Sequence, residues 1–402
     1  MTMPQPSRTQ STFTPPVPEA KRWIEGVSFP ADRPLVNVSQ AAPVDPPPAA
    51  LRRAMAEAME RPETHLYGPV LGLPALREAL ARHWSAHYDA TVRADNIAIT
   101  AGCNQAFAAT LAAIAGEGDE VLLPTPWYFN HKMWLDMQGV RSIPLPTDDR
   151  LLPRAETARA LITERTRAIV LVSPNNPGGV EYPAETLAEL YDLARQHGLK
   201  LIVDETYKDF DSRSGAPHDL LSREGHEETL IQLYSFSKAY RLTGHRVGAI
   251  VAAPSLLQEI EKFQDTVAIC APQLGQIAAL WGLENLAQWV AGERDEILAR
   301  GRAISEQFPK LAAKGWKLKG LGAYFAYVEH PFAESSDVLG RRLVHEAGVL
   351  ALPGTMFMPE DDADGARHFR FAFANLDAAG ITTLFDRLSA LDWPLAGADA
   401  PA

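Results

Sequence analysis

Lys238 is the residue of this 402-residue chain whose surroundings best suit covalent chemistry. It lies in the stretch SFSKAYRLTGHRVG, residues 235–248, between two apolar runs at 230–234 and 247–253. Such runs predict buried strands, so the lysine is expected on a loop beside the core. A partly desolvated lysine loses its proton more easily, and its neutral amine can attack a carbonyl carbon to form a Schiff base.

Arg246 lies on the same loop and presents a rigid fork of donors that suits phosphate oxygens. Pyridoxal 5′-phosphate (PLP) carries an aldehyde and a phosphate in one molecule, so the loop is a candidate PLP site. A solvated loop rich in Lys and Arg is the alternative for this stretch taken alone. The PLP interpretation requires that other unusual residues gather nearby.

The elements around this loop predict an α/β fold. Apolar runs at 96–100, 121–123, 168–172 and 199–203 alternate with helical patterns up to about residue 290. This alternation is typical of a mostly parallel sheet covered by helices on both faces. Ligands of such sheets bind outside the carboxyl ends of the strands, so the residues that follow each run are the next candidates.

Asp204 directly follows the apolar run 199–203. A carboxylate at the end of a buried strand is costly unless it is paired. PLP needs an acid opposite its pyridine nitrogen to keep that nitrogen protonated. Asp204 is the candidate acid, and Tyr207 is the candidate donor to the ring oxygen O3′. A helix cap is the alternative for Asp204 taken alone.

Two other strand ends supply polar candidates. The turn after run 168–172 contains Asn176, whose amide is a second possible donor to O3′. Run 96–100 leads to Gly102, Cys103 and Asn104 at a predicted helix start, where free N–H groups favour anions. Gly102 would let a phosphate approach the backbone closely.

An aromatic group and an arginine complete the candidate set. Three consecutive aromatic residues follow another strand, and one of them could stack on the PLP ring: Trp127, Tyr128 and Phe129. Tyr128 is preferred, and core packing is the alternative for the others. Arg370 alternates with phenylalanines, which fits either an interface ion pair or a bidentate clamp for a substrate carboxylate.

Taken together, these residues resemble the fold-type I PLP-dependent enzymes, and among them the class I/II aminotransferases that include aspartate and aromatic aminotransferases. The resemblance covers roughly residues 30–390. It rests on motifs that occur in the family's order: Tyr67-Gly68-Pro69, Thr100-Ala101-Gly102, Asn176-Pro177-Gly178-Gly179, Asp204-Glu205-Thr206-Tyr207, Ser235-Phe236-Ser237-Lys238, Gly244-His245-Arg246-Val247-Gly248, Pro353-Gly354 and Arg370.

The resemblance implies a role for each candidate. Lys238 would form the internal aldimine and then act as general base and acid. Asp204 would pair with the ring nitrogen, and Asn176 and Tyr207 with O3′, while Arg370 would clamp the substrate α-carboxylate. The implied phosphate-binding residues are Ser235, Arg246, the backbone at Cys103 and Asn104, and Tyr67 from a partner subunit.

Two departures from the family pattern concern the substrate. Ala41 stands where the family often has a glycine two places before a proline, and its methyl group would narrow the expected substrate site. No arginine is identified that would bind a second carboxylate, so specificity for aspartate is not supported. The family's Asn-Pro-Thr-Gly reads Asn176-Pro177-Gly178-Gly179, a mild change.

The composition of the whole chain limits the partners and the cellular environment that are expected for this site. Its formal net charge of −12 argues against nucleic acid as the main partner. The two cysteines are far apart and in no metal-like spacing, so neither a metal site nor a disulfide framework is expected, and a reducing cytoplasm fits. No signal sequence and no membrane-spanning run is found. The protein is expected to be soluble and cytoplasmic.

The change of pattern near residue 290 predicts a second, smaller α+β domain. The expected division is a flexible N-terminal tail (1–20), a segment joining the small domain (21–49), a large PLP-binding domain (50–290), the small C-terminal domain (291–394) and a flexible tail (395–402).

The predicted function is that of a PLP-dependent aminotransferase, a transferase of nitrogenous groups. It would move the amino group of an L-amino acid to a 2-oxo acid by a ping-pong mechanism, as a homodimer. A PLP-dependent lyase, synthase or oxidase of the same fold is the nearest alternative. A PLP-fold sensor domain of a regulator is a more distant one, because about 20 residues before the family-like region are too few for a DNA-binding helix-turn-helix.

Overall fold

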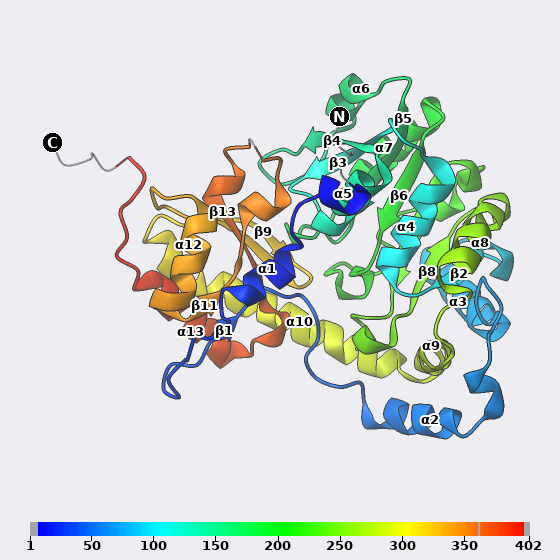
Figure 1. The fold of residues 1–402 in the computed structure, drawn as a ribbon, viewed down its shortest axis with the longest axis horizontal. Coiled ribbons are helices and arrows are strands. Elements are labelled where there is room, and N and C mark those ends of the chain that lie inside the picture. The colour runs from blue at the N-terminus through cyan, green and yellow to red at the C-terminus, as the bar shows by residue number, and fades with distance from the viewer. Residues whose placement is uncertain (1–6, 361, 398–402) are drawn as a thin grey trace, which may run out of the picture.

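Two bodies of different size make up the structure, a computed structural model that describes residues 7–360 and 362–397. The larger body, cyan and green in Figure 1, surrounds a seven-stranded sheet, and the smaller one, mostly yellow to red, surrounds a four-stranded sheet. The first strand of the chain, β1 (Val36–Asn37), pairs in parallel with β11 (Val349–Leu350) in the smaller body. The N-terminal segment therefore contributes to the smaller body.

The seven-stranded sheet has the order β2-β8-β7-β6-β5-β3-β4. Strand β8 is antiparallel to both of its neighbours, and the other four neighbouring pairs are parallel. The strands are β2 (Ile97–Thr100), β3 (Glu120–Thr125), β4 (Arg141–Pro146), β5 (Thr166–Val172), β6 (Lys200–Asp204), β7 (Leu230–Ser235) and β8 (Gly248–Val251).

Both faces of this sheet are buried, as the almost continuous apolar runs predict. In β5, Ile169 and Leu171 enter the core on one face, while Ala168 and Val170 enter the core on the other. Helices on the first face are α3 (Pro74–Tyr88), α7 (Ala184–Gln196) and α9 (Gln273–Asn285), and α4 (Cys103–Ile114), α5 (Phe129–Gln138) and α8 (Pro254–Ala268) cover the second. Two further helices of this body are α2 (Ala49–Met59) and α6 (Ala155–Leu161).

The smaller body packs helices against an antiparallel sheet of order β12-β13-β10-β9. Its strands are β9 (Lys317–Gly322), β10 (Phe325–Glu329), β12 (Leu352–Pro353) and β13 (His368–Ala372). Its helices are α11 (Pro309–Ala312), α12 (Ser336–Arg342) and α13 (Ala378–Ser389), and the long helix α10 (Ala287–Gln307) joins the two bodies (Figure 1). The expected α/β fold with a mostly parallel sheet and a smaller α+β domain is confirmed.

The N-terminal segment departs from the sequence expectation. Residues 7–20 do not form a free tail, because Arg8–Ser11 form the 3-10 turn η1 and α1 begins at Pro16 (Pro16–Arg22). Ala20 of α1 is fully buried in a cluster that includes Phe129 of the larger body and Leu352 of the smaller one. The expectation is wrong here because the segment bridges the two bodies.

At the other end, residues 398–402 of the expected C-terminal tail lie outside the described residues. Leu395 forms an isolated bridge with Phe332, so the tail is held at its start. Among the described residues no helix is long and apolar enough to cross a membrane.

One edge of the large sheet collects the carboxyl ends of six strands. Strands β3, β4, β5, β6 and β7 run in parallel, and two successive antiparallel pairings give β2 the same direction. Register places Val172 beside Asp204 and Ser235 beside Gly248, which in turn pairs with Thr100. The residues that follow these strands therefore converge at one edge.

Candidate active site

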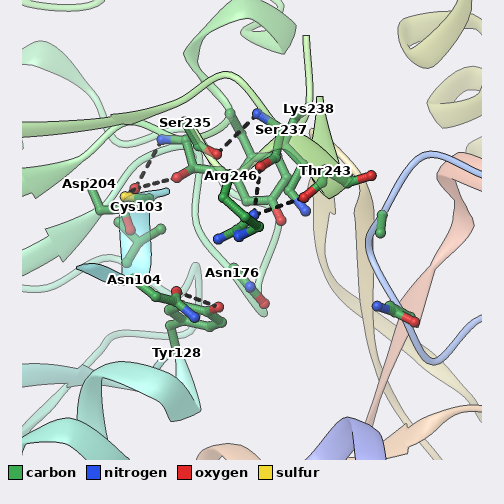
Figure 2. A pocket seen from close by; sticks show the side chains of 15 residues that line it. Cys103, Asn104, Tyr128, Asn176, Asp204, Ser235, Ser237, Lys238, Thr243 and Arg246 are labelled. Atoms are coloured by element: carbon green, nitrogen blue, oxygen red, sulfur yellow. Dashed lines mark hydrogen bonds between the residues drawn. The ribbon is translucent and has the colours of Figure 1, made fainter. Parts of the chain in front are cut away.

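A cavity of about 300 Å³ opens at this edge (Figure 2). It brings together nine of the residues predicted from the sequence: Cys103, Asn104, Tyr128, Asn176, Asp204, Tyr207, Ser235, Lys238 and Arg246. It is also lined by residues that sequence reasoning missed: Gln40, Ala42, Val172, Thr206, Ser237 and Thr243. Most lining residues belong to the larger body, and Gln40 and Ala42 arrive from the N-terminal segment.

Lys238 reaches the cavity from the turn that follows β7. Its Nζ lies 5.7 Å from the centre of the Tyr207 ring and donates a hydrogen bond to the carbonyl oxygen of Ala41. Among the described residues no carboxylate forms an ion pair with it. Burial, together with the positive charges of Arg370 and Arg246, lowers the pKa of the Lys238 amine from 10.5 to about 8. The amine is therefore partly neutral near physiological pH.

Asp204, the last residue of β6, is held by three neighbouring side chains. Its Oδ1 accepts hydrogen bonds from the Thr206 hydroxyl at 2.7 Å and the Thr206 backbone N–H at 3.0 Å, and the Cys103 thiol donates to it at 3.5 Å. His131 Nε2 lies 3.3 Å from Oδ2. Burial opposes ionisation, but the hydrogen bonds from His131 and Thr206 outweigh it and keep the Asp204 pKa below its ordinary value.

His131 was missed by sequence reasoning. It is buried on α5, where its ring stacks on Phe107 with centroids 3.9 Å apart. Its Nδ1 has no hydrogen-bond partner among the described residues, so its contact with Asp204 is the polar interaction that places the ring. The available signal was spacing, because His131 follows Tyr128 by three positions and so lies on the same face of the helix start.

The cavity end near Arg246 is suited to an anion. Arg246 Nη1 donates to the Thr243 carbonyl at 3.0 Å and to the Ser237 hydroxyl at 3.4 Å, and it forms no ion pair with the described residues. A Cβ on Gly102 would stand 2.1 Å from the Arg246 guanidinium, so any other residue at 102 would displace the guanidinium from its position. Gly102 precedes the twelve-residue helix α4, whose first N–H groups face this end.

Arg370, a buried residue of β13 in the smaller body, does not line the cavity itself but contacts Asn176, which does. Its Nη1 donates to Asn176 Oδ1 at 3.0 Å, and its Nη2 donates to the carbonyl oxygen of Ser39. Its Nε has no hydrogen-bond partner among the described residues. Burial lowers the pKa of Arg370 to about 10, so the guanidinium remains charged at neutral pH. A charged fork without a carboxylate partner is suited to bind one.

Of the three consecutive aromatic residues, Tyr128 lines this cavity. Its hydroxyl accepts from Asn130 Nδ2 at 2.8 Å and lies 3.4 Å from Asn104 Oδ1. Trp127 packs in the core beneath the sheet, and Phe129 packs on Phe357 with ring centroids 5.6 Å apart. The alternative reading of Trp127 and Phe129 as packing residues therefore agrees with their positions.

Four predicted residues are not among those that line the cavity: Gly102, Arg370, Ala41 and Tyr67. Ala41 contributes its backbone carbonyl to Lys238, and the neighbouring Gln40 and Ala42 line the cavity. Tyr67 is 77% exposed and does not line the cavity of its own chain. Its expected contribution across a subunit interface stays a prediction, and the exposure of its side chain agrees with that role.

Comparison with known proteins identifies the family. The family described as "Aminotransferase class I and II" matches residues 33–388. The chain belongs to this family. It is 30% identical to an aspartate aminotransferase of Pyrococcus abyssi over 77% of this chain and 80% of the relative. It is 31% identical to an aromatic aminotransferase of Arabidopsis thaliana over 77% and 78%.

A solved structure agrees with this membership. The aspartate aminotransferase of Thermus thermophilus with maleate superposes with a TM-score of 0.86 at 25% identity, covering 96% of this chain and 99% of that one. The predicted family, the fold-type I architecture and the activity are confirmed. This aminotransferase transfers amino groups between amino acids and 2-oxo acids with PLP as its cofactor.

The cavity fits PLP at each of its polar groups. The glycine at 102 leaves room for a phosphate beside Arg246, and Asp204 supplies an ionised acid across the cavity. Asn176 Oδ1 is engaged by Arg370, which leaves the Asn176 Nδ2 free to donate toward a ring oxygen. Burial raises the Tyr207 pKa well above 10, so its hydroxyl keeps its proton and remains a donor.

Proposed function

We propose that this cavity is the active site of the aminotransferase and that Lys238 is the residue that binds the cofactor covalently. The observation that carries the proposal is the Lys238 amine, with its pKa lowered to about 8 and no ion-pair partner among the described residues, in one cavity with Asp204. A neutral amine is both the nucleophile for a carbonyl carbon and a base for a proton.

The proposed division of labour follows from the contacts of each side chain. PLP, when bound, supplies a carbonyl carbon for the amino group and an electron-withdrawing ring. Asp204 holds a negative charge opposite the ring nitrogen, and the hydrogen bonds from Thr206 and the contact with His131 keep it ionised. Tyr207 and the Nδ2 of Asn176 donate to the ring oxygen.

The phosphate is assigned to the end of the cavity formed by Gly102, Cys103, Asn104, Ser235 and Arg246. Tyr128 is assigned to the ring face, because it is the one aromatic residue of the triplet that lines the cavity. Cys103 has its pKa raised well above the ordinary value, chiefly by burial, so its thiol stays protonated and its role is to donate to Asp204.

The substrate is assigned to the other end of the cavity. Arg370 binds the α-carboxylate of the amino acid or the 2-oxo acid and exchanges the Ser39 carbonyl for it. This contact presents the Cα hydrogen to Lys238, which accepts the proton at Nζ and returns it later. Ala41 lies at this end. Arg246 is the one arginine among the residues that line the cavity, and it is assigned to the phosphate, so none of the lining residues is an arginine available for a second substrate carboxylate.

The proposed assembly is a homodimer in the cytoplasm, with Tyr67 reaching the partner's phosphate site. Support comes from exposed apolar side chains in two segments of the larger body: Met59, Leu66, Tyr67, Val267 and Ile269. The Leu66 carbonyl accepts from Gln273 Nε2 at 3.0 Å, which ties the segment of Leu66 and Tyr67 to α9. The domain division at residues 49–50 and 290–291 is likewise proposed. Support comes from one core cluster that is built only from segments outside residues 50–290, namely Val36 and Val38 with residues from Ile304 to Trp393.

The test of Lys238 is the visible absorption of the purified protein with PLP. The wild type should show an absorption band that sodium borohydride converts to a stable covalent adduct on a peptide containing Lys238. Lys238→Ala should bind PLP without forming that adduct, and Lys262→Ala, an exposed lysine on α8, should behave as the wild type. An adduct retained in Lys238→Ala would overturn the proposal.

The same preparation tests the reaction and the assembly. Amino acids added one at a time, without a 2-oxo acid, should bleach the band, and a 2-oxo acid should restore it. Release of ammonia with the band retained would indicate a lyase or an oxidase instead. Sedimentation analysis should give twice the 44.0 kDa chain mass, and a monomer with full activity would contradict the assigned role of Tyr67.

A further inference from the structure

A short stretch of the N-terminal segment forms one wall of the cavity. We call residues 39–42 the wall segment. Gln40 and Ala42 line the cavity, while the carbonyl oxygens of the alternate residues accept hydrogen bonds from the two cations of the site. The Ser39 carbonyl accepts from Arg370, and the Ala41 carbonyl accepts from Lys238. The wall segment thus touches both residues assigned to catalysis and substrate binding.

The smaller body holds this wall segment through one stretch of chain, residues 370–375. Besides the Arg370 contact, the Ala372 N–H donates to the Val38 carbonyl at 2.8 Å. Asn375, which follows β13 in the 3-10 turn η11 (Phe373–Asn375), donates from Nδ2 to the Ala42 carbonyl at 2.7 Å. The strand that carries the carboxylate clamp therefore also anchors the wall of the substrate site.

These ties differ in what happens to them during the reaction. The Arg370 tie is given up when a carboxylate binds, and the Lys238 tie is given up when its amine reacts. The hydrogen bond from the Ala372 N–H to the Val38 carbonyl is kept throughout the reaction, but Val38 precedes the wall segment. Ser39 is also held by a hydrogen bond from its hydroxyl to Asn37 Oδ1 at 2.8 Å. Once Arg370 and Lys238 have given up their bonds, the hydrogen bond from Asn375 is the one that still holds residues 40–42 among the described residues.

We propose that Asn375 is a positioning residue for the substrate. By holding the Ala42 carbonyl, it fixes Gln40 and Ala42 against the part of the cavity where the substrate side chain lies, without touching substrate or cofactor itself. The next residue, Pro43, has no N–H and offers no replacement donor. The inference rests on the proposed assignment of Arg370 to the substrate carboxylate.

The first test separates substrate binding from chemistry. Asn375→Ala removes the donor, and Asn375→Asp keeps the shape of the side chain but places an acceptor against the carbonyl. Both should raise KM for the amino acid and for the 2-oxo acid by roughly fivefold to tenfold, the effect of one lost hydrogen bond. The change in kcat should be smaller, and the affinity for PLP should not change, because the phosphate end is untouched.

A matched control is Asn285→Ala. Asn285 also donates from Nδ2 to a backbone carbonyl, that of Trp281 at 2.8 Å, but it lies on α9 away from the cavity. Its KM values should equal those of the wild type. Asn375→Asp serves as the test variant if Asn375→Ala folds poorly.

The second test reads the wall segment directly in the cofactor-free protein. Hydrogen exchange of the peptide that covers residues 38–45 should be faster in Asn375→Ala than in the wild type, while peptides of the seven-stranded sheet should be unchanged. Unchanged KM values with unchanged exchange would overturn the inference. If Arg370→Ala also left KM unchanged, the proposed assignment of Arg370 to the substrate carboxylate would be wrong. If Arg370→Ala raised KM and the Asn375 variants did not, that assignment would remain and only the role of Asn375 would be refuted.

Discussion

The proposed cofactor end and the proposed substrate end of the site are built differently. At the cofactor end, a single sheet delivers Asp204 and Ser235 from adjacent strands, and Asp204 is surrounded by donors. At the substrate end, Arg370 comes from the smaller body and is held by an amide oxygen and a carbonyl oxygen, with one nitrogen unpartnered among the described residues. The wall segment comes from the N-terminal part of the chain.

The difference matches the needs of two ligands, a cofactor that stays bound and a substrate that is exchanged in each reaction cycle. A carboxylate with several donors keeps its charge and position whatever else binds, which suits a resident cofactor. A buried guanidinium bound only to neutral acceptors gains from any carboxylate that displaces them, which suits a substrate that must arrive and leave. Mutations should therefore act on the chemical step at one end and on substrate affinity at the other.

The largest expected effect is at the cofactor end. Asp204→Asn removes the charge but keeps the shape, and kcat should fall about 10²–10³-fold, as for the loss of one built-in electrostatic group. PLP should stay bound, because the phosphate end is intact. Steady-state kinetics and the absorption band measure the two quantities, and Asp386→Asn, on the exposed face of α13, is the control. A near-normal kcat would remove Asp204 from the mechanism.

The next effect concerns the charge of Lys238. With a pKa lowered to about 8, the neutral amine that attacks a carbonyl is about 1% of the total at pH 6 and about half at pH 8. The rate at which cofactor-free protein forms its covalent bond with PLP should rise about tenfold per pH unit below pH 8 and then level off. N-acetyl-lysine methylamide, with an ordinary pKa, should keep rising beyond pH 9. A matching profile for both amines would refute the lowered pKa.

At the substrate end, Arg370→Ala should raise KM for amino acids and 2-oxo acids by roughly 10- to 100-fold, since a hydrogen bond to a charged group contributes about 1.5–3 kcal/mol. The affinity for PLP should change little. Arg342→Ala is a control within the smaller body, because Arg342 forms exposed ion pairs with Glu334 and Glu346. An unchanged KM would mean that the carboxylate binds elsewhere.

The smallest effect should come from His131, which acts on the cofactor end through another residue. His131→Phe keeps the stacking on Phe107 but removes the partner of Asp204 Oδ2, so the Asp204 pKa should rise. We expect kcat to fall about tenfold, the equivalent of about 1.4 kcal/mol. The loss should be larger at pH 6 than at pH 8, since a carboxyl with a raised pKa is protonated as the pH falls. A loss independent of pH would argue for a purely steric role.

Nine residues predicted from the sequence line one cavity because strand ends leave a local signal. Asp204 and Asn176 each follow an apolar run, and parallel strands bring such positions to one edge without knowledge of the packing. Lys238 was found in the same way, after β7. The other six strands of the sheet were predictable for the same reason, since they are buried, whereas the edge strand β4 is partly exposed and was not predicted.

The substrate end was predicted less completely because its parts meet only in the folded chain. Gln40 and Ala42 lie in a segment without periodicity, and their place beside the cavity depends on pairing of β1 with β11 and on Asn375. The regular structure within residues 7–20 was missed for a related reason. Helix α1 has only seven residues, and contacts with both bodies stabilise it.

The contact between Gly102 and Arg246 determines what a substitution at position 102 would do. A side chain of any size at position 102 would overlap the guanidinium at 246, and the backbone there already adopts a φ of 88° that glycine tolerates best. The guanidinium is the far end of a flexible side chain and can move aside, but it would then leave the position from which it faces the anion. A substitution at 102 should therefore act on a residue 144 positions away in the sequence, by displacing Arg246.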